Sequence, residues 1–220
     1  MQPRVLSVNA GRLERVPGVR RPSGIRKHPV DRIDVRDPGP KPGPDNRGEG
    51  SGVVGDRIGN GRHHGGDTHA VLAVAREELD WWSRELAREL GDGMFGENLT
   101  TLGVEVDDAR LGEQWRVGAA LLQVSGPRTP CATFAAHMGE ERWLRRFTAR
   151  ARVGAYLSVV EAGVIEPGDP IEVVERPGHD ITVTTCFLAV MGDRDLAAEV
   201  VAAEVLPPAE QQRLASRQRR

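Results

Sequence analysis

The sequence has few cysteines and no long apolar run, and each absence excludes a class of protein. Only Cys131 and Cys186 are cysteines among the 220 residues, which excludes a disulfide framework, a four-cysteine iron–sulfur cluster and a zinc ribbon. Cys186–Met191 is about as long as any apolar run, whereas a membrane span needs roughly 18 residues. The N-terminus shows no apolar core typical of a signal peptide. We therefore expect a soluble, cytoplasmic protein with no membrane partner.

The charge balance argues against a nucleic-acid partner. The net charge is −2, so no overall basic field would attract a polyanion. The charge is uneven, because residues 1–62 carry a balance of +6 and residues 63–220 a balance of −8. The positive charge of residues 1–62 could hold an anion, although an excess of basic residues more often forms a solvent-exposed face. At about 150 residues per domain, the length predicts one domain with at most a small appendage.

Short β-rich segments dominate the first three quarters of the chain. Alternation and β-branched residues predict strands at 4–9, 30–35, 114–117, 119–125, 156–160 and 171–175. From Asp37 to Gly61, 12 of 25 residues are Gly or Pro, which predicts a long irregular loop, either a binding loop or a disordered one.

One apolar stripe predicts a long helix in the middle of the chain. The stripe is spaced by three and four residues and consists of Val71, Ala75, Leu79, Trp82, Leu86 and Leu90. Asp67 or Thr68 would cap this helix and Gly91 would end it. Shorter helices are predicted at 132–138, 140–151, 182–191, 194–205 and 208–217. Together these elements predict a β-rich α+β barrel with a helical C-terminal appendage.

Cys131 is the strongest single candidate for chemistry. It follows a strand and a loop stiffened by Pro127 and Pro130, and it stands where a helix is expected to begin. The helix dipole and Arg128 would both favour the thiolate, which is a nucleophile or a soft metal ligand. An inert, buried cysteine is the alternative, and this is the role we expect for Cys186.

The segment from Arg62 to His69 forms a second cluster, with His63, His64, Gly65 and Gly66 inside it. Glycines allow close backbone approach, and the expected helix behind them would offer free N–H groups to an anion. The spacing does not match a phosphate-binding P-loop. A zinc site shared with Cys131 and histidines hydrogen-bonded in a turn both remain open.

A third cluster runs from Phe95 to Thr101 and brings Glu97, Asn98 and Thr100 into one predicted loop. A carboxylate, an amide and a hydroxyl together can hydrogen-bond a polar heterocycle. The same residue types also stabilise ordinary loops, so both readings stay open.

These clusters, in this order, resemble the MOSC domain, named for the C-terminal part of molybdenum cofactor sulfurases, and in particular its stand-alone YiiM-like branch. The matching segments are 24–30, 55–57, 63–66 with Ala70 and Val71, 95–100, 112–113 and 123–131. The resemblance covers about residues 24–174, and the segment after Ile181 resembles a three-helix extension. We expect a MOSC domain at 1–177 and a helical extension at 178–220.

The resemblance implies a β-rich, barrel-like fold that binds a molybdenum cofactor, a metal held by a pterin. It places Cys131 on the family's cysteine, which implies a catalytic thiolate that ligates the metal. The residues implied in cofactor binding are Arg26, Lys27, His63, His64, Gly65, Gly66, Asn98, Thr100 and Arg128.

The function implied by the resemblance is reduction of N-hydroxylated compounds, such as N-hydroxylated nucleobases, to amines. The chain has no flavin or nicotinamide fingerprint, so an external electron-transfer protein is expected as a partner, and a homodimer stays open. Three alternatives remain. Cys131 would carry a persulfide in a sulfur carrier or cofactor-delivery module, the chain would bind a pterin without turnover, or Cys131 would act with His63 or His64 in a hydrolase.

Overall fold

The protein is built on one large mixed sheet that carries two groups of helices. A computed structural model describes residues 2–43 and 48–218; residues 44–47 of the predicted loop lie outside them. The strands are β1 (Arg4–Gly11), β2 (Lys27–Val30), β3 (Ile33–Val35), β4 (Val71–Ala75), β5 (Leu99–Leu102), β6 (Gln114–Val117), β7 (Ala120–Pro127), β8 (Ala155–Glu161), β9 (Gly163–Ile165) and β10 (Ile171–Glu175). The α-helices are α1 (Arg76–Glu85), α2 (Ala132–Met138), α3 (Trp143–Arg150), α4 (Val183–Met191), α5 (Arg194–Ala203) and α6 (Pro208–Gln218).

The sheet is open rather than a closed barrel. Eight strands follow the order β10-β6-β7-β8-β4-β5-β1-β2, and β3 pairs with β9 in a separate two-stranded sheet. Neighbours in the large sheet are antiparallel except β4 and β5. The start of β10, at one end of the sheet, still contacts the start of β1, the strand next to the other end. The Val5 amide donates to the Asp169 carbonyl (2.9 Å) and the Ile171 amide to the Pro3 carbonyl (3.1 Å). The α+β class is confirmed, and the predicted barrel is a curled sheet without a closing ladder.

The long helix predicted from the apolar stripe is wrong at both ends, since α1 stops at Glu85 rather than before Gly91. Val71–Ala75 is the strand β4, buried along its whole length between β5 and β8, and α1 begins only at Arg76. A central strand covered on both faces is a continuous apolar run, so Val71 and Ala75 match helical spacing by coincidence. Only a short 3-10 turn, Asp67–His69, precedes the strand.

The other predicted elements are largely confirmed. The hairpin of β6 and β7, the helix α2 and the three C-terminal helices lie within a few residues of their expected bounds. The strand predicted at 30–35 is wrong, because the chain bends there and its ends belong to β2 in the large sheet and β3 in the small one. The short strand β9 was not predicted. Leu99–Leu102, expected in a loop, forms the buried strand β5 beside β1 and β4. Its sequence Leu-Thr-Thr-Leu lacks the alternation that marks a half-buried strand.

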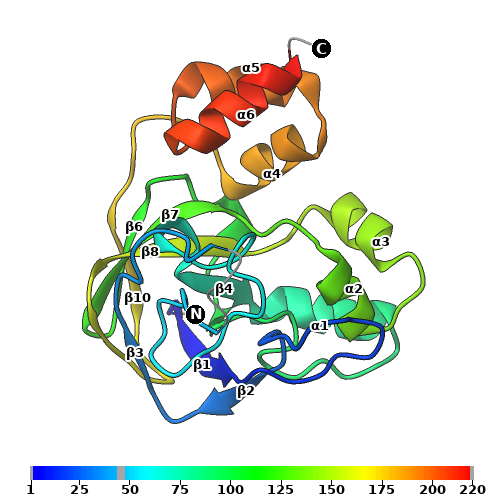
Figure 1. Cartoon of the computed structure of the whole chain (residues 1–220). Coiled ribbons are helices and arrows are strands. Elements are labelled where there is room, and N and C mark those ends of the chain that lie inside the picture. Colours follow the sequence, from blue (N-terminus) through cyan, green and yellow to red (C-terminus); the bar gives the residue numbers. More distant parts are fainter. Residues whose placement is uncertain (1, 44–47, 219–220) are drawn as a thin grey trace.

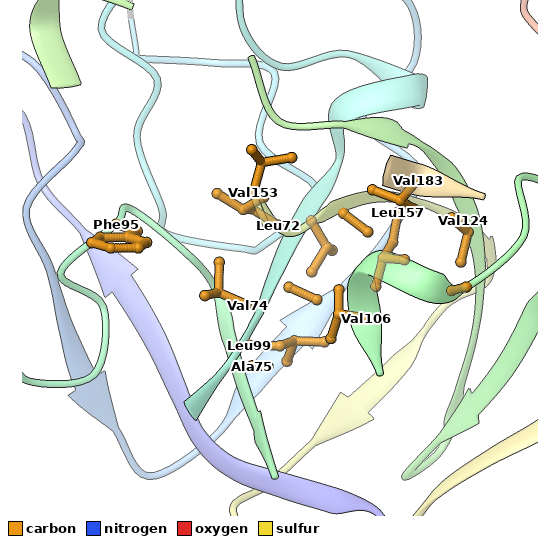
Figure 2. Close-up of a cluster of buried hydrophobic side chains, with 14 of the residues drawn as sticks. Leu72, Val74, Ala75, Phe95, Leu99, Val106, Val124, Val153, Leu157 and Val183 are labelled. Carbon is orange, nitrogen blue, oxygen red and sulfur yellow. The ribbon is translucent and has the colours of Figure 1, made fainter. Parts of the chain in front are cut away.

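The sheet interior and the two helix groups define the layers of the molecule. Figure 2 shows apolar side chains of several strands gathered in one cluster, among them Leu72, Leu99, Val124 and Leu157, all buried. The helices α1–α3 lie at one side of the sheet, whereas α4–α6 form a separate group above it, with α4 against β7 (Figure 1). No helix of the described chain is long and apolar enough to cross a membrane.

Candidate functional site

Two adjoining cavities meet at Cys131. The inner cavity, of about 300 Å³, lies between the loop 19–25, the loop 57–65 and the strand ends of the sheet. The outer cavity, of about 510 Å³, lies between residues 127–133 and the C-terminal helices α4 and α6. Both cavities are lined by Asn60, His64, His69, Cys131 and Thr133. A ligand that spans this junction would therefore contact Cys131.

Cys131 occupies the position that the sequence predicts, at the start of α2. Its extended backbone (φ −132°, ψ 165°) makes it the N-cap residue of that helix, and its carbonyl accepts the Ala135 amide (3.0 Å). The side chain is half-buried. An N-cap residue sits beside the unpaired amides of the first turn, which favour a negative charge. The half-buried thiol is thus open to a ligand at the start of the helix.

Arg128 is buried beside Cys131 with part of its guanidinium unpaired. Its side chain stacks on Phe134, 3.5 Å from the ring centre, and Nη2 donates to the Phe95 carbonyl (3.2 Å). Nη1 is buried and has no hydrogen-bond partner. Of the five such polar atoms in the described chain, this one alone belongs to a residue that lines either cavity. Because an unpaired buried donor is unfavourable, Nη1 marks a position where a ligand acceptor fits.

Three more titratable side chains line the junction. Burial, followed by the positive charges of Arg128 and its neighbours, lowers the pKa of His64 to about 4. Burial, followed by the charge of Lys41, lowers the pKa of His69 to about 3. The His69 ring lies 4.3 Å from the Tyr156 ring, centre to centre, and burial raises the Tyr156 pKa above its usual value. At neutral pH both imidazoles are therefore uncharged and the phenol keeps its proton.

A separate buried network holds the loops that carry the inner cavity. The Asp56 carboxylate accepts both contacts of Lys27 Nζ (2.5 Å) and further bonds from the Gly11 amide, Ser51 Oγ and Asn98 Nδ2. The Asn98 side-chain oxygen accepts the Leu72 amide (3.2 Å). None of the buried polar side-chain atoms of Lys27, Asp56 and Asn98 lacks a hydrogen-bond partner within the protein.

Glu97 and Thr100 extend this network away from the cavity. The Glu97 carboxylate accepts the Gly93 amide (2.6 Å), the Phe95 amide (2.8 Å) and the Thr100 hydroxyl (3.1 Å). Complete burial raises the Glu97 pKa to about 7, against the opposing effect of these hydrogen bonds. The network thereby fixes the turn of residues 93–97 that presents Phe95 and Gly96 to the inner cavity.

The residues expected to bind a cofactor fall into three groups. Lys27, His64, Gly65, Asn98 and Arg128 line the inner cavity, together with Cys131. His63 lines only the outer cavity. Arg26, Gly66 and Thr100 line neither.

Two expectations about the histidine cluster are wrong. The anion site at a helix N-terminus after Gly66 does not form, because a three-residue 3-10 turn and then β4 follow. No group of three His, Cys, Asp or Glu side chains in the described residues is arranged to hold a metal ion. This removes the zinc site shared by the histidines and Cys131.

Sequence reasoning missed Tyr156 and did not single out His69. Tyr156 is the only tyrosine of the chain and was expected only as part of a strand, so nothing local marks its approach to Cys131. His69 stands in the histidine cluster, where the count of three histidines was the available signal. The basic residues Arg20, Arg21 and Arg57 also line the inner cavity, and only the charge surplus of the N-terminal part hints at them.

Comparison with known proteins finds relatives of one kind. A family model described as the MOSC domain matches residues 60–172, just over half of the chain. The chain is 33% identical to YflK of Bacillus subtilis over 121 residues and 33% identical to YiiM of Escherichia coli over 135 residues. It is 34% identical over 131 residues to a protein of Gibberella moniliformis named reductase.

These matches cover parts of the relatives, while one solved structure matches throughout. The aligned segments are 55% of this chain and of YflK, 60% of this chain and of YiiM, and 58% of this chain but 23% of the reductase. The crystal structure of YiiM from Geobacillus stearothermophilus has a TM-score of 0.75 and covers 98% of this chain and 99% of that chain. Its 24% identity shows a shared fold.

Proposed function

Because this chain belongs to the MOSC domain family, we propose that it is an oxidoreductase that holds a molybdenum cofactor and reduces N-hydroxylated compounds to amines. The observation that carries the proposal is the meeting of the half-buried Cys131 thiol with the unpaired Nη1 of Arg128 on one cavity. A relative named reductase supports the oxidoreductase class.

The residues around the inner cavity fit such a cofactor. A thiolate is a soft ligand suited to a metal already bound by sulfur, and Cys131 would supply it. The unpaired Nη1 of Arg128 would donate to an acceptor on the pterin. Arg20, Arg21 and Arg57 line the same cavity and would bind the phosphate, because guanidinium groups pair with phosphate oxygens in two-point contacts.

The cofactor would supply the two-electron redox chemistry, and the protein would supply ligation, orientation and protons. The overall reaction takes an N-hydroxylated compound, two electrons and two protons to the amine and one water molecule. The Tyr156 side chain lines the same cavity as Cys131, so its hydroxyl would be placed to donate a proton to the departing oxygen. His64 and His69 are uncharged there and would orient the substrate through hydrogen bonds.

An external electron-transfer protein would deliver the electrons. The sequence carries no flavin or nicotinamide fingerprint, so a purified chain loaded with cofactor should not accept electrons directly from NADH. Reduction by NADH without a partner would contradict this part of the proposal.

The test is a reductase assay on chain produced in cells that make the cofactor. A reduced viologen dye supplies electrons, and the amine formed from an N-hydroxylated purine is measured. Cys131→Ala should lower the rate at least about a thousandfold, because a metal ligand is lost. Arg145→Gln is the control and should keep the wild-type rate, since Arg145 is an exposed arginine of α3 that lines neither cavity. Equal rates for wild type and Cys131→Ala would overturn the proposal, as would a persulfide on Cys131 in a chain that is inactive despite loaded cofactor.

A further inference from the structure

The outer cavity adjoins the inner cavity at Cys131 and is a second arm of the proposed site, lined by a different set of side chains. We propose that this arm binds the substrate, and that the substrate is a flat N-hydroxylated ring compound carrying an anionic group, which Lys41, Arg213 and Arg217 recognise. The inference rests on the proposed function for the role of Cys131, and it adds the substrate class and the residues that select it.

The position of the cavity makes it a route to Cys131. Its wall runs from Thr129 and Cys131 on one side to the helices α4 and α6 on the other. The inner cavity holds the unpaired guanidinium atom and the basic loop that suit a cofactor, so the outer cavity is the remaining space that reaches the same thiol. A substrate would enter between the sheet and the C-terminal helices and present its N–OH group at Cys131.

The far wall of the cavity is apolar. Val190 and Cys186 of α4, Leu206, and Leu214 of α6 line it; of these, Cys186, Leu206 and Leu214 are buried. Apolar side chains favour an aromatic or heterocyclic ring over an extended polar chain. The wall belongs to α4–α6, so in this protein the C-terminal helices would contribute directly to substrate selection.

The mouth of the cavity is basic. Lys41, Arg213 and Arg217 line it, and Glu210 is the one carboxylate among the lining residues. Glu210 offsets one of these charges through an ion pair with Arg213 (3.8 Å), so two positive charges remain in excess among the lining residues. Arg213 Nε also donates to the Ala209 carbonyl (3.3 Å) and Arg217 Nη1 to the Val190 carbonyl (3.2 Å), which hold these two side chains at the cavity. An anionic group at the mouth would pair with the excess positive charge while the ring lies on the apolar wall.

A phosphate and a carboxylate share the required charge, and two pairs of probes distinguish them. The first pair is adenosine 5′-monophosphate and adenosine, and the second is 4-aminobenzoate and aniline. These probes are redox-inert amines, so their binding is measured by calorimetry on the full cofactor-loaded chain without any electron donor. The wild type should bind the anionic member of one pair at least tenfold more tightly than its neutral partner.

The variant with Lys41→Gln, Arg213→Gln and Arg217→Gln should lose this preference, with the anionic probe bound at least about tenfold more weakly. Arg145→Gln is the matched control, because Arg145 is an exposed arginine of α3 that lines neither cavity. It should keep the wild-type preference. Arg213→Lys with the other two residues intact should also keep it, because the charge at the mouth is retained.

The outcomes separate this inference from the proposed function. A preference for the phosphate or the carboxylate that disappears in the triple variant supports the anion site, even if the reductase assay fails. Equal affinity for the neutral and anionic members of both pairs overturns it, as does a preference that the triple variant retains. Unchanged circular dichroism and thermal unfolding of the triple variant would show that its loss is not a loss of fold.

Discussion

Two clusters of polar residues lie at the inner cavity, one around Asp56 and Glu97 and one around Arg128 and Cys131, and they differ in how many of their hydrogen-bonding atoms have partners. Around Asp56 and Glu97, each carboxylate accepts several hydrogen bonds from amides and side chains of distant segments. Around Arg128 and Cys131, a guanidinium nitrogen has no partner and a thiol faces open space. In the first group every buried polar side-chain atom has a partner within the protein, whereas in the second group Arg128 Nη1 has none.

This difference distinguishes residues that stabilise the fold around the cavity from residues that would bind a ligand in it. Asn98 and Thr100 belong to the motif through which the chain resembles its family, yet their side chains hold β1, β4 and the turn before β5 together. Buried polar groups are stabilising only when all of them are paired. We therefore expect substitutions in the Asp56–Glu97 network to change the stability of the fold, and substitutions at Arg128 and Cys131 to change ligand binding.

The largest effect on stability is expected at Asp56. Asp56→Ala would leave the Lys27 ammonium buried without its carboxylate, and breaking a buried ion pair in this way costs about 3–5 kcal/mol. Urea unfolding would measure the loss in free energy of unfolding. Asp31→Ala, at an exposed aspartate, should change it by less than about 0.5 kcal/mol. A loss at Asp56 as small as that at Asp31 would refute the structural role of the network.

A smaller effect with a distinctive pH dependence is expected at Glu97. The folded-state pKa of about 7 exceeds the ordinary 4.5, so the folded chain binds more protons than the unfolded chain between these values. The contribution to the free energy of unfolding is therefore fully present below pH 4.5 and is lost as the pH rises through 7.

Glu97→Gln removes this titration but places an amide NH₂ against an N–H donor. At pH 5 the variant should be less stable than the wild type by about 1–2 kcal/mol, and the difference should shrink between pH 5 and pH 8. Urea unfolding at several pH values compares the two chains. A difference that stays constant with pH would contradict the raised pKa.

The smallest effect on stability is expected at Arg128, although it is as buried as Asp56. Arg128→Met keeps contact with Phe134 and removes a guanidinium that is only partly paired, and such replacements are often neutral or stabilising. The free energy of unfolding should change by less than about 1 kcal/mol in the chain without cofactor, while retention of the pterin on gel filtration should fall sharply. A loss of several kcal/mol would place Arg128 with the structural network instead.

Local patterns predicted much of this molecule, and tertiary contacts decided the rest. The hairpin of β6 and β7 and the helices α2 and α4–α6 follow from alternation, helical spacing and turn residues, all of which lie within one segment. Val71–Ala75 was misassigned because a central strand and one side of a helix can share the same apolar residues. Leu99–Leu102 was missed because its burial comes from β1 and β4, which are distant in sequence.

The residues of the site likewise fall into those that local sequence predicts and those that only tertiary contacts bring together. Cys131 at a helix start, with Arg128 three residues before it, could be predicted from neighbouring prolines and the expected helix. The approach of His69 and Tyr156 to that thiol depends on how β8 and the turn before β4 are placed. The outer cavity depends on the packing of the C-terminal helices, for which no single segment carries a signal.

The measurement that tests the central claim most directly is molybdenum content by mass spectrometry, combined with pterin fluorescence after oxidation. Wild type, Cys131→Ala and Cys186→Ala would be produced together in cells that make the cofactor. The account predicts near-stoichiometric molybdenum and pterin in the wild type and in Cys186→Ala, and a large loss of molybdenum in Cys131→Ala. Folded wild-type protein that contains neither molybdenum nor pterin, or equal molybdenum in all three chains, would contradict it.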